Sequence, residues 1–169
     1  MSAATTSNTA NQEVYRTVFI GLGSNIAPDE NIPRALELLK QAVSINALST
    51  AWETPAVGSD GPDFINMVVS VSTPLTAEAL KNEVLRNIEN QLGRLRTADK
   101  HAPRPIDLDI LIYDGLTVDP QIWEYPHWAI PLAELIPEYR HDKYDITLGD
   151  VARKLKQRSG CHLQPHPIV

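Results

Sequence analysis

The sequence predicts an α+β protein with a ferredoxin-like βαββαβ core, made of an antiparallel sheet and helices, plus a C-terminal helical extension. Two observations predict this class. Runs rich in β-branched residues alternate with segments whose apolar residues recur every three or four positions. The 169 residues, 43% of them hydrophobic, suit one globular domain. We expect residues 1–13, which are polar, to be a disordered leader and residues 14–169 to form a single domain.

The first half of the chain predicts a strand, a helix and two further strands. The segment VYRTVFIGLGSN is rich in β-branched and aromatic residues and is typical of a strand that ends at Gly21 and Gly23. Apolar residues from position 32 to 43 then follow a helical period. Residues 45–54 predict the second strand, and a break rich in glycine and proline separates it from the third, FINMVVSVST.

The second half predicts a helix, a strand and the extension. Thr76 is a suitable N-cap for a helix that ends at Gly93. The segment RPIDLDILIYDG predicts a strand closed by a turn, and we expect the two core helices to cover one face of the sheet. PLAELIP predicts a short helical turn, and residues 147–157 a last helix, in which Thr147 and Asp150 form half of a capping box.

The composition limits the classes of partner. A formal net charge of −6 argues against a nucleic-acid-binding surface, which is basic. No run of residues approaches the roughly 20 apolar positions of a membrane span. Cys161 has no second cysteine for an internal disulfide. We therefore expect a cytoplasmic monomer or weak dimer that binds neither nucleic acid nor membranes.

Two aspartates on the last predicted core strand indicate a metal site. Alternate side chains share a face, so Asp107 and Asp109 point one way, opposite to a row of isoleucine and leucine side chains at Ile106, Leu108, Ile110 and Ile112. Their Cβ atoms lie about 7 Å apart in a strand, which lets both carboxylates reach one or two cations. Magnesium suits them because it needs only one or two carboxylates when a nucleotide supplies the other ligands. The alternation also fits a solvated sheet face.

A basic segment precedes these aspartates. Arg94, Arg96, Lys100 and Arg104 face a single acid, Asp99, and arginine binds phosphate oxygens in pairs. The segment therefore predicts a polyphosphate site beside the metal, although a charged solvent-exposed loop has the same composition. The glycine loop GLGSNI has Ile26 where a dinucleotide fingerprint has its third glycine, and it lacks the Gly-Lys-Ser/Thr of a P-loop. Both of those motifs are rejected.

Four segments together resemble the 6-hydroxymethyl-7,8-dihydropterin pyrophosphokinases of folate biosynthesis. They are FIGLGSN, ETPAVGSDGPDFINMVV, LGRLR with APRPIDLDILIYDG, and YPH. The resemblance runs from about residue 18 to residue 137. It implies transfer of the β,γ-diphosphate of ATP, as co-substrate, to the hydroxymethyl oxygen of the pterin, with AMP released.

The resemblance also implies roles for the charged residues. Asp107 and Asp109 would bind two magnesium ions and, with Arg94 and Arg104, would be the catalytic residues. The residues matching the ATP-binding positions are Glu89, Arg94, Arg96, Arg104 and His127. An isolated histidine such as His127 is also often structural.

Five residues match the pterin site of the family: Thr54, Pro55, Val57, Phe64 and Asn66. Phe64 would stack on the ring and Asn66 would hydrogen-bond its polar edge. A core role for Phe64 and a backbone partner for Asn66 stay open. The long segments 58–62 and 94–103 would fold over the substrates and exclude water.

The chain departs from the family after His127. Only three residues, Trp128, Ala129 and Ile130, separate it from Pro131, where relatives carry a longer segment with an arginine and a second stacking phenylalanine. Trp128 could supply that aromatic face. His101 also stands where an aromatic residue is common. Two alternatives to the pyrophosphokinase therefore stay open, namely the same chemistry on another pterin alcohol and a non-catalytic ferredoxin-like ligand-binding module.

Overall fold

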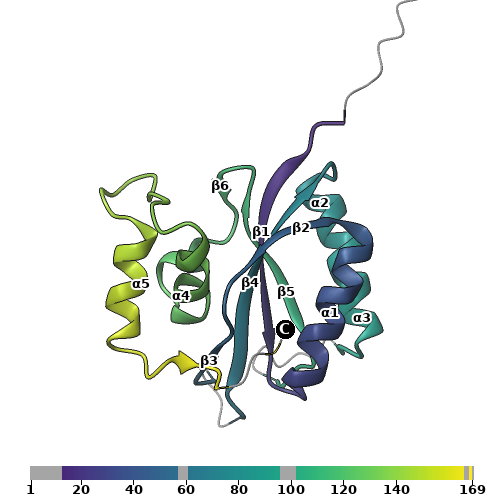
Figure 1. The fold of residues 1–169 in the computed structure, drawn as a ribbon, viewed down its shortest axis with the longest axis horizontal. Helices are drawn as coiled ribbons and strands as arrows, with labels where there is room; N and C mark the ends of the chain where they lie inside the picture. Colours follow the sequence, from purple (N-terminus) through teal and green to yellow (C-terminus); the bar gives the residue numbers. More distant parts are fainter. Residues whose placement is uncertain (1–12, 57–60, 96–101, 166–167, 169) are drawn as a thin grey trace, which may run out of the picture.

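An antiparallel sheet lies between two layers of helices (Figure 1). The computed structural model describes residues 13–56, 61–95, 102–165 and 168. The predicted leader therefore lies almost entirely outside the described residues. Among the described residues, no helix is both long and apolar enough to cross a membrane.

The strands follow the predicted ferredoxin-like order. The central strand β1 (Arg16–Ser24) pairs with β4 (Phe64–Thr73) on one side and with β5 (Asp107–Tyr113) on the other, both antiparallel. Beyond β4 lie β2 (Ser44–Leu48) and β3 (Trp52–Thr54), and the sheet is completed by β6 (Leu116–Thr117) beside β5 and β7 (His162–Leu163) beside β3. Because β1 and β2 are separated by β4, the first βαβ unit is split as predicted.

The two core helices cover one face of this sheet, as expected (Figure 1). They are α1 (Pro28–Ala42) and a continuous helix made of α2 (Ala77–Ala79), the π-helical turn η1 (Leu80–Leu85) and α3 (Arg86–Gln91). The hydroxyl of Thr76 accepts from the backbone N–H of Ala79 at 3.2 Å, which confirms the predicted cap.

The C-terminal extension covers the opposite face. It contains the 3₁₀ turn η2 (Pro120–Trp123), α4 (Pro126–Leu135) and α5 (Leu148–Lys156). The hydroxyl of Thr147 accepts from the backbone N–H of Asp150 at 3.2 Å, so the predicted cap of the last helix is present. Residues 131–137 were predicted as one short turn, but α4 begins at Pro126. A proline suits the first turn of a helix because its missing N–H is not needed there.

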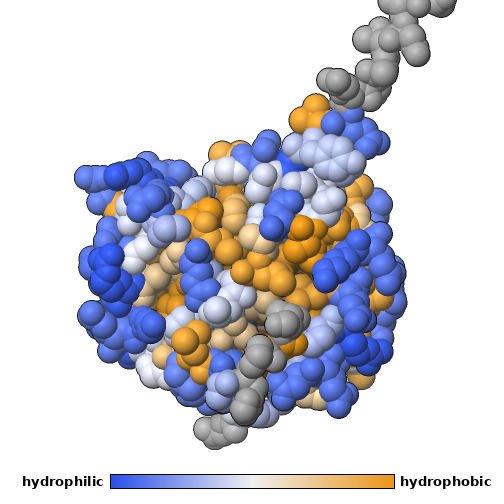
Figure 2. Space-filling model, viewed as in Figure 1, coloured by the Kyte–Doolittle hydropathy of each residue, from blue (hydrophilic) through white to orange (hydrophobic). Residues whose placement is uncertain are grey.

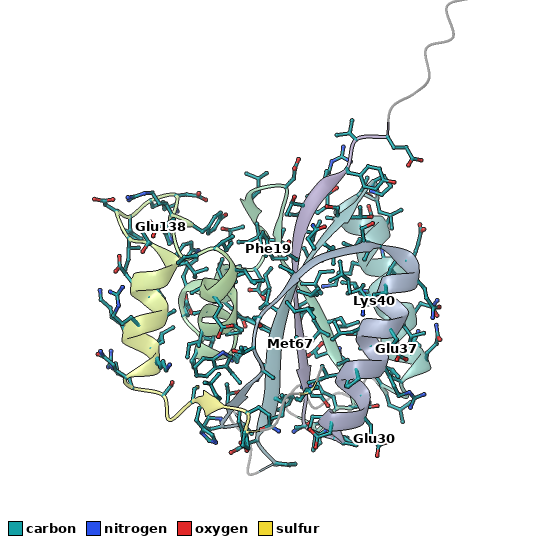
Figure 3. All side chains as sticks on the ribbon, viewed as in Figure 1. Phe19, Glu30, Glu37, Lys40, Met67 and Glu138 are labelled. Atoms are coloured by element: carbon teal, nitrogen blue, oxygen red, sulfur yellow. The ribbon has the colours of Figure 1, made fainter. Side chains whose placement is uncertain are left out.

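Each face of the sheet has its own hydrophobic core. Under α1 and α3, the core includes Leu22 and Met67, and Figure 3 shows Met67 at the sheet while Glu30 and Glu37 lie along the outer side of α1. Under α4 and α5, Val68 packs with residues of both helices. In the space-filling view, hydrophilic residues cover the outer sides of the helices, and apolar surface gathers between them where β2 crosses (Figure 2).

A β-bulge in β5 overturns one prediction about its faces. Phe19 pairs with Ile112 and Ile20 with Ile110, which leaves Leu111 as an extra residue. Leu108 and Ile110 face the α1 core as predicted. Ile112, predicted on the same face, packs with Leu111 in the α4 core instead, because one inserted residue reverses the alternation beyond it.

Two predicted strand boundaries were also wrong. β1 does not end at Gly21 and Gly23 but runs through both of them to Ser24. Residues 45–54 form two short strands rather than one, with a break after Leu48. At this break the hydroxyl of Ser49 accepts from the backbone N–H of Val68 at 2.8 Å, so a side chain replaces part of the ladder.

Candidate active site

A cavity of about 480 Å³ opens on the sheet face that carries α4. Its floor is formed by the ends of three central strands, and its far wall by the segment from β6 to α4. The lining residues are Gly23, Thr54, Pro55, Phe64, Asn66, Arg104, Asp107, Asp109, Asp119, Gln121, Tyr125, His127 and Trp128. Residues far apart in the sequence therefore meet in one pocket.

The two aspartates lie side by side on the floor. Asp107 pairs with Gly23 and Asp109 with Gly21 of β1, so each aspartate lies beside a residue that has no side chain. Burial, followed by repulsion from Asp107, raises the pKa of Asp109 to about 6, while Lys81 at 3.7 Å opposes the rise. The site thus holds a carboxylate whose charged form needs a nearby cation.

Two arginines neutralise Asp107 from opposite ends. Arg104 Nη1 donates to Asp107 Oδ2 at 2.6 Å, and Arg94 Nη1 donates to Asp107 Oδ1 and to Glu89. Burial alone lowers the pKa of Arg94, but the charges of Asp107 and Glu89 outweigh it and raise the pKa. Asp107 therefore forms ion pairs with two guanidinium groups, one at each carboxylate oxygen.

The end of α3 places Arg94 beside the strand. Gly93 has a positive φ of 82°, and the backbone N–H groups of Gly93 and Arg94 donate to the carbonyls of Asn90 and Glu89 at 3.1 and 2.9 Å. This is a Schellman turn, which requires the left-handed glycine. The Glu89 side chain, 2% exposed, accepts from the backbone N–H of Leu108 at 3.0 Å, so helix and strand are joined at the site.

The predicted pterin residues gather at the other side of the cavity. Asn66 Nδ2 donates to Thr54 Oγ1 at 2.7 Å, and both side chains are buried. A Cβ atom at Gly23 would lie 2.8 Å from Asn66 Oδ1, so the glycine gives the amide its place. The guanidinium of Arg104 lies 5.9 Å from the centre of the Phe64 ring, which links this side to the aspartates.

The start of α4 forms the aromatic wall. Trp128 lies directly against Gly21, where a Cβ atom would come within 2.4 Å of its ring. His127 contacts the Trp128 ring edge-on at 4.9 Å between centroids. Burial lowers the pKa of His127 to about 4, although Asp107 opposes the shift. His127 is therefore neutral at pH 7 and offers a hydrogen bond rather than a charge.

Three residues of the wall were missed from the sequence: Asp119, Gln121 and Tyr125. The bulge explains the first two. The carbonyl of Leu111 accepts from the backbone N–H of Asp119 at 3.1 Å, and Asp119 Oδ1 accepts from the N–H of Gln121 at 2.9 Å. The Asp-Pro pair that opens η2 was a local signal for this cap, but nothing local placed it opposite β5.

Not every predicted site residue lines the main cavity. Glu89 and Arg94 line a smaller adjoining pocket with Lys81 and both aspartates. Val57 and Arg96 lie outside the described residues, as do His101, residues 58–60 and residues 96–101 of the predicted covering segments. Trp128 does line the cavity, but only 5% of it is exposed.

The donor atoms suit a hard cation only if a ligand completes the shell. Among the described residues, no group of three or more His, Cys, Asp or Glu side chains is placed to hold a metal ion. Asp107 and Asp109 are two carboxylates on a rigid strand, and magnesium accepts that number when phosphate and water supply the rest. The residues present therefore fit a metal that arrives with an anionic substrate.

Paired aspartates beside two arginines in adjoining pockets of a ferredoxin-like sheet suit an enzyme that transfers a phosphate-containing group. The family model for 7,8-dihydro-6-hydroxymethylpterin-pyrophosphokinase (HPPK) matches residues 19–137. The chain belongs to this family.

Relatives of two lengths support the assignment. The 2-amino-4-hydroxy-6-hydroxymethyldihydropteridine pyrophosphokinase of Bacillus subtilis is 35% identical over 155 residues, which cover 84% of this chain and 92% of that protein. The Aquifex aeolicus protein of the same name is 31% identical over 138 residues, covering 76% and 85%. A folate synthesis bifunctional protein of Arabidopsis thaliana is 36% identical over 133 residues, covering 72% of this chain but only 27% of that protein.

Solved structures support the fold. Plasmodium falciparum HPPK-DHPS superimposes with a TM-score of 0.69 at 15% sequence identity, covering 88% of this chain and 46% of that one. The predicted α+β, ferredoxin-like class is thereby confirmed.

Proposed function

We propose that this chain transfers the β,γ-diphosphate of ATP to the hydroxymethyl oxygen of 6-hydroxymethyl-7,8-dihydropterin and releases AMP, with Asp107 and Asp109 holding two magnesium ions. Membership of the pyrophosphokinase family supports the reaction. The observation that carries the site assignment is that one cavity is lined by both aspartates and by the buried pair Thr54 and Asn66. We assign the aspartate side of this pocket to the polyphosphate and the Thr54–Asn66 side to the heterocycle.

The phosphate end uses Arg94 and Arg104. Both guanidinium groups pair with Asp107, and phosphate oxygens offer the same paired acceptors as a carboxylate. A triphosphate would compete with Asp107 for these arginines, so that the Asp107 carboxylate would become available to hold a cation. Magnesium, when bound, neutralises charge on the phosphates and aligns them for in-line displacement.

The heterocycle end uses Thr54 and Asn66. Their mutual hydrogen bond fixes the orientation of the Asn66 amide, with its carbonyl oxygen beside Gly23. An amide suits the mixed donors and acceptors of a pterin edge. Phe64 and Pro55 supply flat apolar contact in the same cavity.

Trp128 occupies the wall where the family's longer segment is missing. Its ring is held over Gly21 and lines the cavity, so it excludes water from the reacting groups. This changed wall supports a second candidate, the same transfer to another pterin alcohol.

We propose Arg96 and Val57 as further ATP and pterin contacts, and Glu89 and His127 as ATP-site residues, from their family positions alone.

The test is AMP formation. Pure protein with magnesium, ATP and 6-hydroxymethyl-7,8-dihydropterin is expected to release AMP and a diphosphorylated pterin in equal amounts, measured by chromatography. A folded protein that forms no AMP contradicts the proposal. Parallel assays with other pterin alcohols identify the preferred substrate by kcat/KM.

A control separates catalysis from mere binding. If the chain were a ligand-binding module, Asp107→Ala and Asp109→Ala would leave pterin binding in the presence of nucleotide almost unchanged, and no AMP would form in the wild type.

We also propose that the protein resides in the cytoplasm and is a monomer or a weak dimer. Two plant relatives are named as mitochondrial, and sedimentation with fractionation checks both.

A further inference from the structure

A carboxylate on α4 joins the aromatic wall of the cavity to the strand that carries Thr54. Glu134 Oε1 accepts from the indole Nε1–H of Trp52 and from the hydroxyl of Thr50, each at 2.7 Å. Glu134 Oε2 accepts from the backbone N–H of Thr50, also at 2.7 Å. Both oxygens of one side chain therefore hold the segment that leads into β3.

One of the two residues that Glu134 holds, Trp52, is paired in the sheet with the proposed pterin site. Trp52 lies opposite Asn66 in the β3–β4 ladder, and Thr54 lies opposite Phe64. Only 4% of Trp52 is exposed, and Lys156 of α5 lies over its ring at 4.5 Å. Because Trp52 is fixed on two sides, a shift of its indole moves the short strand that positions Thr54.

The other end of the connection is the wall. Glu134 lies in the same helix as His127 and Trp128, two turns further along. α4 also packs through Ile130 against Trp52. One helix thus presents Trp128 to the cavity and is hydrogen-bonded through Glu134 to the segment entering β3, so the position of β3 relative to α4 depends on Glu134.

We infer that Glu134 is a positioning residue that ties α4 to β3 and thereby sets the geometry of Thr54 and Asn66 for the pterin. The inference rests on the proposed function for its kinetic consequence but not for its structural one. Glu134 itself does not line the cavity, and acts through Trp52.

Two substitutions at Glu134 grade the effect. Glu134→Ala removes every acceptor. Glu134→Gln keeps one oxygen, which can still accept from Trp52 and from the Thr50 hydroxyl. Its amide NH2, however, faces the backbone N–H of Thr50 and cannot accept from it. The matched control is Glu138→Ala, an exposed glutamate shortly beyond α4 (Figure 3).

The first measurement needs no activity. In ¹H–¹⁵N spectra, Glu134→Ala is expected to shift the indole resonance of Trp52 and the side-chain amide resonances of Asn66, while Glu134→Gln shifts the Asn66 pair less and Glu138→Ala leaves both unchanged. A Trp52 shift with no change at Asn66 overturns the inference, because the grip would then end at the indole. This outcome is independent of whether the protein forms AMP.

The second measurement is the division between KM values. Glu134→Ala is expected to raise KM for the pterin about tenfold and KM for ATP less than about twofold, since misplacement of a binding group by a fraction of an ångström has effects of this order. Glu134→Gln should recover most of the loss. Equal rises in both KM values, or a fall in thermal stability with no change in either, assign Glu134 a purely structural role.

A double variant tests the route. Trp52→Phe keeps an aromatic side chain, although a smaller one, and removes the Nε1–H that donates to Glu134. If Glu134 acts through Trp52, Glu134→Ala combined with Trp52→Phe raises KM for the pterin no more than Glu134→Ala alone. Effects that multiply would show that the two residues act separately and would overturn the proposed route.

Discussion

The two faces of the sheet are built differently from the same strands. Under α1 and α3 the face is apolar from Val18 to Leu22 and from Val71 to Ile65. Under α4 and α5 it changes along the strand, from Val68 in the core to Asn66 in the cavity. The first face supplies stability and the second divides its length between packing and chemistry. Substitutions on the two faces should therefore separate folding from activity.

The largest expected effect breaks the polar half of the second face. If the proposed function is right, Asp107→Asn and Asp109→Asn should each lower kcat by about a thousandfold, because each removes a charge that would hold the cations. Asp109→Asn should not lower the melting temperature, because burial and the nearby charge of Asp107 disfavour the charged form of the Asp109 carboxylate. AMP release and thermal unfolding measure the two quantities. More than a tenth of the wild-type activity in either variant would remove these residues from the metal site.

The next effect concerns pH. The pKa of Asp109 is raised to about 6 by burial first and by Asp107 second, so protons compete with magnesium below pH 6. The apparent magnesium affinity should fall about tenfold per pH unit there. Activity titrated with magnesium from pH 5 to 7 checks this, and a flat profile would contradict it.

The same carboxylate gives a stability difference of known sign. Because the pKa of Asp109 is higher in the folded state, this group stabilises the fold below pH 3.8, its unfolded pKa. That stabilising contribution is lost as the pH rises through about 6, its folded pKa. Relative to Asp109→Asn, metal-free wild type should therefore lose about 1 kcal/mol of unfolding free energy between pH 4 and 7, a figure reduced because the side chain is 35% exposed. Taking the difference cancels the opposite contribution of His127, whose pKa is lowered to about 4.

A pair of glycines sharpens the contrast within the second face. Gly21→Ala places a methyl group 2.4 Å from the Trp128 ring and should lower stability by about 1–3 kcal/mol. A methyl group in Gly23→Ala comes close only to the end of the Asn66 side chain, at 2.8 Å, since the Phe64 ring lies 3.9 Å away. It should chiefly raise KM for the pterin, by about tenfold for one lost hydrogen bond. Denaturant unfolding and AMP kinetics on both variants distinguish the two, and identical profiles would contradict the division of this face.

The smallest effect lies on the first face. Ile110→Val should lower the unfolding free energy by about 0.5–1.5 kcal/mol because it removes one buried methyl group. Ile110 adjoins Asp109 in the chain but points into the α1 core, so kcat/KM should stay within about twofold of wild type. A large loss of activity here would mean that the faces are coupled.

Sequence reasoning succeeded where the signal was local. The period-two pattern separated Asp107 and Asp109 from Leu108 and Ile110, and helix caps at Thr76 and Thr147 were found from residue type. The pyrophosphokinase family itself was identified from the order of short motifs, and the family model confirms it.

The remainder depended on contacts across the fold. Gly21 and Gly23 were expected to end a strand, yet β1 continues through both of them. Glycine is required at these two positions because a Cβ atom there would collide with Trp128 or Asn66. That need arises from α4 and β4, far away in the sequence. The extra residue at Leu111 has no local signature either, since every neighbour of it is apolar, and only pairing with β1 reveals it.

The extra residue also gives a ruler for comparing chains. Five residues separate Asp109 from Gly115 of the turn. One of them is Leu111, whose carbonyl accepts a hydrogen bond from the backbone N–H of Asp119. A pyrophosphokinase one residue shorter over this interval would keep its aspartates. The residue equivalent to Ile112 would then lie on the sheet face covered by α1 rather than on the face covered by α4. We therefore expect the spacing between the second aspartate and the turn to indicate whether a family member attaches the cavity wall through the same bulge.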